Sequence, residues 1–380
     1  MTRSTRKQVQ VMARWSAADR RYMQQALDLA ALGQGQVEPN PMVGCVIVRA
    51  GRVVGSGFHR WFGGPHAEVH ALRQAGGRAR GATAYVTLEP CSHQGKTPPC
   101  ADALIRAGVR RVMAAMRDPN RLVAGRGFRR LRTAGISVDV GLLRSEAVSL
   151  NKPFVRFHCD RRPFVILKWA QSIDGKIATH TGRSKWITSR QSRKVAHALR
   201  ARVDAVIVGV DTVLADDPEL TARGVRVSRI AWRIVLDTRL RTPLSARVVR
   251  TARRIPTMMV AGSGQARRGR RRSLESAGCH VLECRVVRNG IDLSDLMRYL
   301  HERQMTNVLV EGGGRVLGSF WKAGLADEVH VFVAPKLIGG ETAPGPIRGQ
   351  GPADLTNLPR LRVMAVDRCG PDVHYRLGMR

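Results

Sequence analysis

The spacing of apolar and polar residues divides the first part of the chain into alternating helices and strands. Tyr22, Ala26 and Leu29 recur at helical spacing after Ser16, which can cap a helix together with Asp19. Further helices are predicted over 66–75, 100–107 and 126–134, and strands over 42–48, 52–57, 84–88, 111–116 and 137–140. The order α-β-β-α-β-α-β-α-β predicts a three-layer α/β/α sandwich around one sheet.

The pattern changes between Asn151 and Pro163, where we expect a domain boundary. Beyond it, a helix is predicted over 316–323, and strands over 164–169, 205–210, 233–237, 257–261, 307–311 and 328–334. This alternation predicts a second α/β domain with a mostly parallel sheet. We therefore expect one domain over 18–155 and another over 163–380.

The composition indicates a folded protein that works in a reducing compartment. The chain has 380 residues, enough for two cores, and is 43% hydrophobic. No apolar run reaches the length of a membrane span, and residues 1–15 lack the apolar core of a secretory signal. These residues carry arginines and no acids, which suits either a transit peptide or a basic terminus. The seven cysteines lack disulfide-type spacing, so a cytoplasmic location is expected.

The net charge of +35 predicts attraction to polyanions. Nucleic acids and phosphorylated small molecules are both candidates. The basic run 267–272 is interpreted as a solvated loop, and no aromatic residues are interleaved with it to stack on bases. We therefore expect non-specific nucleic-acid binding rather than a specific nucleic-acid partner.

A candidate zinc site lies in the first half. His66, Cys91 and Cys100 offer one imidazole and two thiolates, which leaves a fourth tetrahedral position open for water. Glu68 can take a proton from that water and pass it to a ring nitrogen and a leaving amine. His-x-Glu followed by Pro-Cys and a further Cys is typical of zinc deaminases, although the loop 92–99 is longer than in that pattern. His70, one helical turn from His66, is interpreted as a structural residue.

A second candidate site lies in the second half. Gly312, Gly313 and Gly314 come after a predicted strand and before a helix, where bare backbone amides can approach an anion. Glu311 ends the strand and is expected to face the same cleft. A tight strand-to-helix turn is the alternative explanation of the glycines. From these residues alone, the second half is expected to bind a phosphorylated ligand.

Ten motifs carry a family resemblance that extends from about Asp19 to the end of the chain. They are Pro39–Gly44, His66–His70, Thr87–His93, Gly95–Cys100, Val123–Gly127, Ser172–Lys176, Ser184–Ser189, Thr212–Pro218, Glu311–Gly314 and Ala334–Gly339. With these motifs the chain resembles the bifunctional riboflavin-biosynthesis family, in which a pyrimidine deaminase is fused to a reductase.

The resemblance implies a fold, two reactions, two cofactors and a set of site residues. It implies a cytidine-deaminase-like α/β/α domain that removes a ring amino group from a phosphoribosyl aminopyrimidine, with one Zn²⁺ per chain. It further implies a dihydrofolate-reductase-like α/β domain that reduces the ribosyl group with NADPH. The implied zinc ligands are His66, Cys91 and Cys100, the proton shuttle is Glu68, and the deaminase substrate contacts are Asn40, His59, His93 and Lys96.

The resemblance also assigns the second half. The implied cofactor contacts are Ala170, Trp186, Thr212, Asp216, Thr238, Gly313, Gly314, Arg315, Val316, Leu317, Gly318 and Ser319. The implied substrate contacts are Ser184, Arg200, Leu220, Arg223 and Glu311. The guanidinium groups of Arg200 and Arg223 suit the substrate phosphate, because arginine can bind oxyanions with two parallel hydrogen bonds.

Two other readings of the sequence stay open. One is a nucleic-acid deaminase of the transfer-RNA adenosine type with an appended basic binding domain, which the net charge favours. The other is a non-enzymatic RNA-binding protein with a structural zinc, although such zinc sites normally use four protein ligands and only three are offered here. A homo-oligomer is possible, and the sequence does not define its size.

Overall fold

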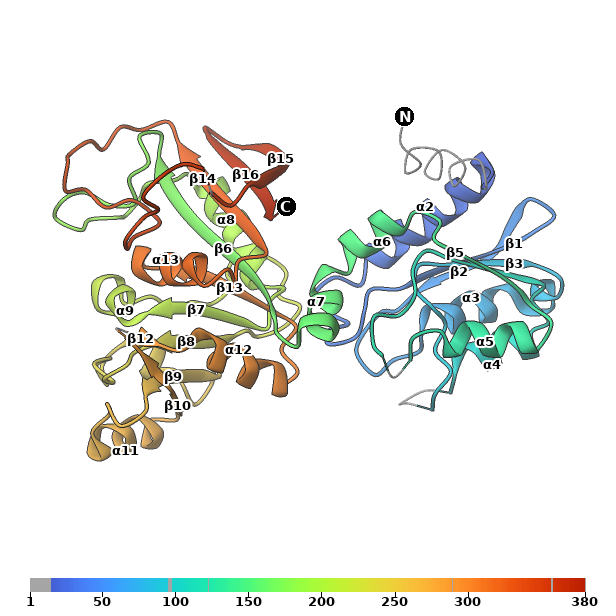
Figure 1. Cartoon of the computed structure of the whole chain (residues 1–380), viewed down its shortest axis with the longest axis horizontal. Helices are drawn as coiled ribbons and strands as arrows, with labels where there is room; N and C mark the ends of the chain where they lie inside the picture. Colours follow the sequence, from blue (N-terminus) through green and yellow to red (C-terminus); the bar gives the residue numbers. More distant parts are fainter. Residues whose placement is uncertain (1–14, 95–97, 122, 289, 357, 380) are drawn as a thin grey trace. The chain divides into compact units, whose positions relative to one another are not determined.

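The computed structural model describes residues 15–94, 98–121, 123–288, 290–356 and 358–379 (Figure 1). The chain folds into two compact units, Met1–Arg161 and Arg162–Arg380, which are described separately below. In the part of the chain that the structure describes, no helix is long and apolar enough to cross a membrane.

The first unit is built around a five-stranded sheet in the order β2-β1-β3-β4-β5. Strand β1 is antiparallel to β2 and β3, whereas β3, β4 and β5 run parallel. The strands are β1 (Gly44–Arg49), β2 (Arg52–Phe58), β3 (Thr83–Val86), β4 (Arg111–Ala114) and β5 (Ser137–Val140). The helices are α2 (Ala17–Ala31), α3 (Ala67–Ala75), the 3₁₀ helix η1 (Gly76–Ala79), α4 (Cys100–Arg106), α5 (Arg126–Thr133), α6 (Arg144–Leu150) and α7 (Lys152–Asp160).

The predicted order of elements and the three-layer arrangement are confirmed for the first unit. Figure 1 shows α2 and α6 on one face of the sheet and α3, α4 and α5 on the other. Ser16 and Asp19 form the expected capping box, in which the Ser16 hydroxyl accepts from the Asp19 N–H and the Asp19 carboxylate accepts from the Ser16 N–H. Helix α2 lies directly on β1, because a Cβ on Gly44 would come within 1.9 Å of the Ala26 carbonyl oxygen.

The second unit contains a nine-stranded sheet in the order β10-β9-β8-β7-β13-β6-β14-β16-β15 and a two-stranded ribbon. Its strands are β6 (Phe164–Ser172), β7 (Ala205–Gly209), β8 (Trp232–Leu236), β9 (Thr257–Gly262), β10 (His280–Cys284), β11 (Val286–Val287), β12 (Gly290–Ile291), β13 (Asn307–Gly312), β14 (Glu328–Ala334), β15 (Leu361–Cys369) and β16 (Asp372–Met379). Its helices are α8 (Arg190–Arg200), α9 (Val210–Asp216), α10 (Arg247–Arg250), α11 (Arg268–Ser276), α12 (Leu293–Glu302) and α13 (Gly314–Lys322).

The prediction of a mostly parallel sheet is confirmed. Seven strands from β10 to β14 run parallel, and only the pairs β14–β16 and β16–β15 are antiparallel. The carboxyl ends of β7, β8, β9 and β13 therefore meet at one edge of the sheet, where ligands bind in open α/β sheets. This edge carries most of the residues that the sequence assigned to the cofactor.

One prediction about the second unit is wrong. The basic run 267–272 is not a loop, because Arg268 begins helix α11. Arginine is a good helix former, and the fully buried Leu274 anchors the helix to the core. Arg270 also donates to the carbonyl oxygen of Leu240 at 3.1 Å. A single apolar contact per turn leaves too weak a periodic pattern to predict this helix from sequence.

Candidate active sites

In the first unit, three side chains with metal-binding atoms converge. His66 is the N-cap of α3, Cys100 is the first residue of α4, and Cys91 lies in the segment after β3. His66 Nδ1 lies 3.2 Å from Cys100 Sγ and 3.6 Å from Cys91 Sγ, and the three ligand atoms lie within 4.8 Å of one another. One nitrogen and two sulfurs at this spacing fit a tetrahedral zinc ion with one position open.

The surroundings favour ionised sulfur at Cys91. Hydrogen bonding with Cys100 lowers the pKa of the Cys91 thiol to about 4, and His66 also lowers it, whereas burial acts to raise it. The backbone N–H of Cys100 donates to Cys91 Sγ at 3.3 Å. Hydrogen bonding with Cys91 in turn raises the pKa of His66. The free amides at the start of α4 thus support a thiolate, as helix N-termini generally do.

Glu68 lies in the first turn of α3 and is only 3% exposed. Burial raises the pKa of Glu68, while the positive charge of His66 acts to lower it. A carboxylate in such surroundings can change its protonation state during a reaction, which suits proton transfer. His70, one turn further along α3, lies outside the ligand cluster. Its buried Nε2 has no hydrogen-bond partner within the described ranges.

The predicted deaminase substrate contacts are only partly described. Asn40 and His59 are brought together, with Asn40 Nδ2 3.2 Å from His59 Nε2. His59 Nδ1 lies 3.1 Å from the Pro65 carbonyl oxygen, so Nδ1 carries the proton and Nε2 accepts from the Asn40 amide. The His59 ring also packs edge-on against His66 at a centroid distance of 5.3 Å. His93 is exposed, and Lys96 lies outside the described residues.

Glu89 is a further residue of this site to which the sequence gave no role. Its side chain is 3% exposed and accepts backbone N–H bonds from Asp118, Gly125, Gly127 and Phe128, at 2.9–3.4 Å. Glu89 therefore fixes Asp118 and the turn 125–128 against the chain that leads through Pro90 to Cys91. A Cβ on Gly127 would come within 1.9 Å of the Pro90 carbonyl oxygen, so this approach is very close. The sequence signal that could have indicated this role is the position of Glu89 directly before the pair Pro90-Cys91.

In the second unit, the glycine-rich turn lies beside the start of another helix. Gly313 has φ +74 and caps α13, and Thr212 lies in the first turn of α9. A Cβ on Gly312 or Gly313 would come within 3.0 or 3.3 Å of the Thr212 hydroxyl. Thr238 follows β8, and its methyl group lies against Gly262 at the end of β9. The structure thus brings Thr212, Thr238 and the start of α13 to the same edge of the sheet.

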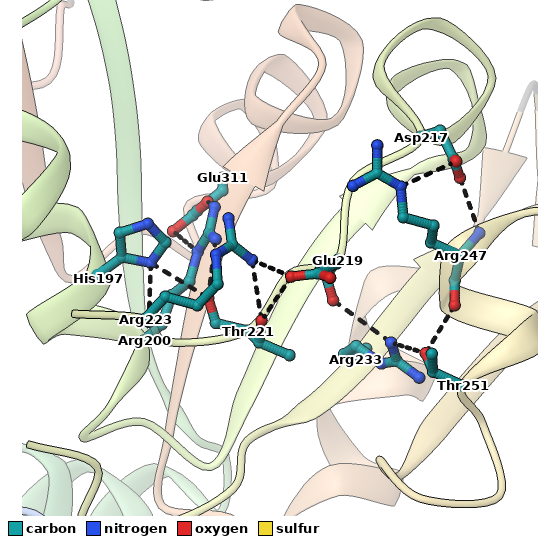
Figure 2. A network of polar contacts seen from close by, with 10 residues as sticks. All are labelled: His197, Arg200, Asp217, Glu219, Thr221, Arg223, Arg233, Arg247, Thr251 and Glu311. Atoms are coloured by element: carbon teal, nitrogen blue, oxygen red, sulfur yellow. Dashed lines mark hydrogen bonds and ion pairs between the residues drawn. The ribbon is translucent and has the colours of Figure 1, made fainter. Parts of the chain in front are cut away.

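A buried ion pair forms the other part of this site (Figure 2). Arg200 Nε donates to Glu311 Oε1 at 2.9 Å, and Arg200 Nη2 donates to Glu311 Oε2 at 2.5 Å. Although burial acts to raise it, the charge of Arg200 holds the pKa of Glu311 below its ordinary value. Lys168 is a further residue of this site that the sequence did not predict. Burial lowers the pKa of Lys168, and the nearby negative charge of Glu311 opposes this effect.

The segment that follows α9 is held by several polar contacts, which Figure 2 shows. Arg223 pairs with Glu219 at 2.5 Å, and the Glu219 carbonyl oxygen accepts from the fully buried Arg233 at 3.4 Å. The Thr221 carbonyl oxygen accepts from Arg200 at 3.2 Å. The same segment places Leu220 in the core with φ +58. It therefore joins Arg223 to the Arg200–Glu311 pair.

The remaining assigned residues lie on separate segments. Ser184 donates to Asp216 at 3.4 Å, and this contact joins the segment before α8 to the end of α9. Ala170 lies within β6. Trp186 is 64% exposed, and the guanidinium of Arg193 lies 4.3 Å from the centroid of its ring. Arg315, Val316, Leu317, Gly318 and Ser319 form the first turns of α13.

The two units match two different sequence families. Residues 16–116 match the cytidine and deoxycytidylate deaminase zinc-binding region, and residues 163–375 match the RibD C-terminal domain. The fold and the sites thus define a chain that joins a zinc-binding deaminase domain to a RibD-type reductase domain. The second match is also unlike an appended nucleic-acid-binding domain, so the transfer-RNA deaminase alternative is not supported.

Full-length relatives define the family more closely. The chain is 46% identical to the riboflavin biosynthesis protein RibD of Aquifex aeolicus, over 93% of this chain and 97% of that protein. It is 43% identical to the protein of the same name from Escherichia coli, over 94% of this chain and 99% of that protein. The chain belongs to the riboflavin biosynthesis protein RibD family of bifunctional deaminases and reductases.

Solved structures agree with this assignment. Acinetobacter baumannii RibD, form 1, has a TM-score of 0.84 and 38% identity, and covers 96% of this chain and 99% of its own. The diaminohydroxyphosphoribosylaminopyrimidine deaminase/5-amino-6-(5-phosphoribosylamino)uracil reductase of Thermotoga maritima has a TM-score of 0.81 and 35% identity, with the same coverage. The expected deaminase-like and reductase-like folds are confirmed.

Proposed function

We propose that this chain catalyses two consecutive steps of riboflavin biosynthesis. The first unit hydrolyses the ring amino group of 2,5-diamino-6-(5-phosphoribosylamino)pyrimidin-4(3H)-one and releases ammonia. The second unit reduces the ribosyl group of 5-amino-6-(5-phosphoribosylamino)uracil to ribityl with NADPH. The observation that carries this proposal is the presence, on one chain, of a His-Cys-Cys cluster beside a buried glutamate and of an arginine-lined site beside a glycine-rich helix start.

In the deaminase, His66, Cys91 and Cys100 would hold one zinc ion. Zinc at such a site lowers the pKa of a water molecule so that hydroxide is available near neutral pH. Glu68 accepts one proton from the attacking water and passes it to the pyrimidine nitrogen. It then takes the second proton of that water, from the hydroxyl formed on the ring carbon, and passes it to the amino group, which departs as ammonia. The buried position of Glu68 excludes competing water and supports both protonation states.

The ring of the deaminase substrate is held by the side chains of Asn40, His59 and His93, together with Lys96, which lies outside the described residues. The hydrogen bond between Asn40 and His59 fixes the orientation of both groups before substrate arrives, which lowers the entropic cost of binding.

In the reductase, two sets of side chains divide the work. NADPH, when bound, supplies a hydride for the sugar. The cofactor is held by Ala170, Trp186, Thr212, Asp216, Thr238 and the segment Gly313–Ser319. The substrate is held by Ser184, Arg200, Leu220, Arg223 and Glu311. Arg223 binds the phosphate, and the ion pair of Arg200 with Glu311 orients the ribose beside Lys168.

This proposal agrees with a cytoplasmic enzyme that has no specific nucleic-acid partner. A reducing cytoplasm keeps Cys91 and Cys100 as thiols that can bind zinc. The large net charge attracts nucleic acid non-specifically, through counterion release that weakens as salt rises.

A coupled assay tests the proposed function. The purified chain should contain about one zinc ion, release ammonia from the diaminopyrimidine, and then oxidise NADPH with the product. Glu68→Gln keeps the shape of the side chain but cannot take up the proton of the water. Ammonia release should therefore fall by roughly 10²–10⁴-fold, while NADPH oxidation with previously deaminated substrate continues. An active protein free of metal, or ammonia release from RNA instead, would exclude this function.

A further inference from the structure

Three charged side chains meet at the carboxyl edge of the nine-stranded sheet. Arg241 follows β8, Asp211 lies in the first turn of α9, and Arg315 lies in the first turn of α13. Arg241 Nη2 lies 2.7 Å from Asp211 Oδ1, and Arg315 Nη1 lies 3.8 Å from Asp211 Oδ2. Two guanidinium groups from separate elements therefore converge on a single carboxylate.

The backbone that carries Arg241 is fixed on both sides. Asp237, which is fully buried, accepts hydrogen bonds from the backbone N–H and the hydroxyl of Thr242, both at 2.7 Å. The backbone N–H of Leu240 donates to the Asp237 carbonyl oxygen at 2.9 Å. Arg270 of α11 donates to the Leu240 carbonyl oxygen at 3.1 Å. Arg241 thus projects from a turn that is held by hydrogen bonds on both sides.

The helices that carry the other two residues begin side by side. A Cβ on Gly209, which caps α9, would come within 2.8 Å of the Val316 side chain on α13. The Gly314 carbonyl oxygen accepts from the backbone N–H of Arg348 at 2.9 Å, which holds the first turn of α13. The cluster of Arg241, Asp211 and Arg315 therefore lies beside the glycine-rich start of α13, at the edge assigned to the cofactor.

The cluster is open to a ligand and contributes little to the stability of the fold. The side chains of Arg241, Asp211 and Arg315 are 52%, 56% and 76% exposed. Exposed ion pairs stabilise a fold very little. Two positive charges face one negative charge, and each guanidinium has five N–H donors, so donors are left over for an anion.

Resting on the proposed reductase function, we propose that Arg241 and Arg315, aligned by Asp211, bind the 2′-phosphate of NADPH and select it over NADH. The 2′-phosphate is the only chemical difference between the two cofactors. The bare backbone of Gly312–Gly314 suits the pyrophosphate that both share. A pair of guanidinium groups suits the phosphate that only NADPH has.

Equilibrium binding to the full chain tests this proposal without turnover. Dissociation constants for NADPH and NADH are measured by fluorescence titration on the wild type, Arg241→Gln, Arg315→Gln and the double variant. Each single change should raise the dissociation constant for NADPH about tenfold or more, as expected for the loss of a charge-assisted hydrogen bond. The dissociation constant for NADH should stay unchanged. The double variant should bind the two cofactors with similar affinity. The fragments 2′,5′-ADP and 5′-ADP should repeat the same pattern.

Arg298→Gln is the matched control. Arg298 also forms an exposed ion pair with an aspartate, Asp295, but lies on α12, before β13. This variant should bind NADPH like the wild type, and all variants should keep the melting temperature of the wild type. If Arg241→Gln and Arg315→Gln weaken the binding of NADPH and of NADH equally, the inference is overturned and the proposed function still stands. A wild type that binds both cofactors equally well would overturn it too, whereas a wild type that binds neither would overturn the proposed function as well.

Discussion

In the first unit, the three candidate zinc ligands come from one short stretch, residues 66–100, and two of them sit at helix starts. In the second unit, the residues of the candidate site extend from Lys168 to Ser319 and meet only because their strands lie in one sheet. The first site depends on the chemistry of a few rare side chains. The second depends on backbone approach and on common charged residues. This difference predicts that the deaminase fails abruptly when one atom changes, whereas the reductase weakens by degrees.

The largest effect is expected from removal of one zinc ligand. Cys100→Ser replaces a thiolate with a poorly ionised hydroxyl, so zinc binding and ammonia release should both be lost. NADPH oxidation with previously deaminated substrate should remain within about twofold of the wild type, because the second unit has its own core. Metal analysis and both assays on the same preparation measure this. Loss of both activities in a protein that is still folded would mean that the two sites are not independent.

A smaller but still large effect is expected from Glu311→Gln. The change leaves the Arg200 guanidinium buried without a countercharge, since the two side chains are 15% and 5% exposed. Breaking such a pair costs about 3–5 kcal/mol, so the free energy of unfolding should decrease by this amount. Because the amide no longer holds Arg200 in position beside the substrate, reductase efficiency should also fall, by roughly a hundredfold. Steady-state kinetics and urea unfolding measure the two effects. Arg223→Gln, which breaks an exposed pair instead, is the control and should not affect unfolding.

An intermediate effect is expected from Glu89→Gln. A glutamine amide can replace only one oxygen of a carboxylate that accepts four backbone N–H bonds, so segment 118–128 should loosen beside the zinc ligands. Ammonia release should fall by about tenfold, mainly through KM, with zinc content retained. Hydrogen exchange of residues 118–128 reports the loosening directly. Unchanged exchange together with unchanged KM would remove Glu89 from the site.

The smallest effect concerns pH and the second unit. Burial lowers the pKa of His374 to about 4, and the charge of the neighbouring His330, 2.9 Å away, acts in the same direction. Between about pH 4 and the unfolded value near 6.5, the unfolded chain binds more protons, so stability falls as pH falls through this window. The free energy of unfolding should be about 2 kcal/mol lower at pH 5 than at pH 7 on this account. Urea unfolding of wild type and His374→Gln at both pH values measures it, and an equal change in both would contradict the assignment.

The sequence by itself determined the order of elements in the first unit and the residues of the candidate zinc site. Local spacing was sufficient there, because His66 directly precedes helix α3 and Cys100 is the first residue of helix α4. The motifs also identified the family and the glycine-rich turn of the second unit. Each of these signals lies within a few residues along the chain, where propensity and chemistry act together.

Only the tertiary structure decided which distant residues share a site. Lys168 comes beside Glu311 because β6 and β13 are in register as far as the pair Leu167–Val310, one residue earlier. The role of Glu89 depends on backbone N–H groups of Asp118 and residues 125–128, which are distant along the chain and donate to its carboxylate. The Arg241, Asp211 and Arg315 cluster likewise depends on three strands that end at one edge. Strand order and register are set by long-range burial and pairing, and a local pattern of residues does not contain that information.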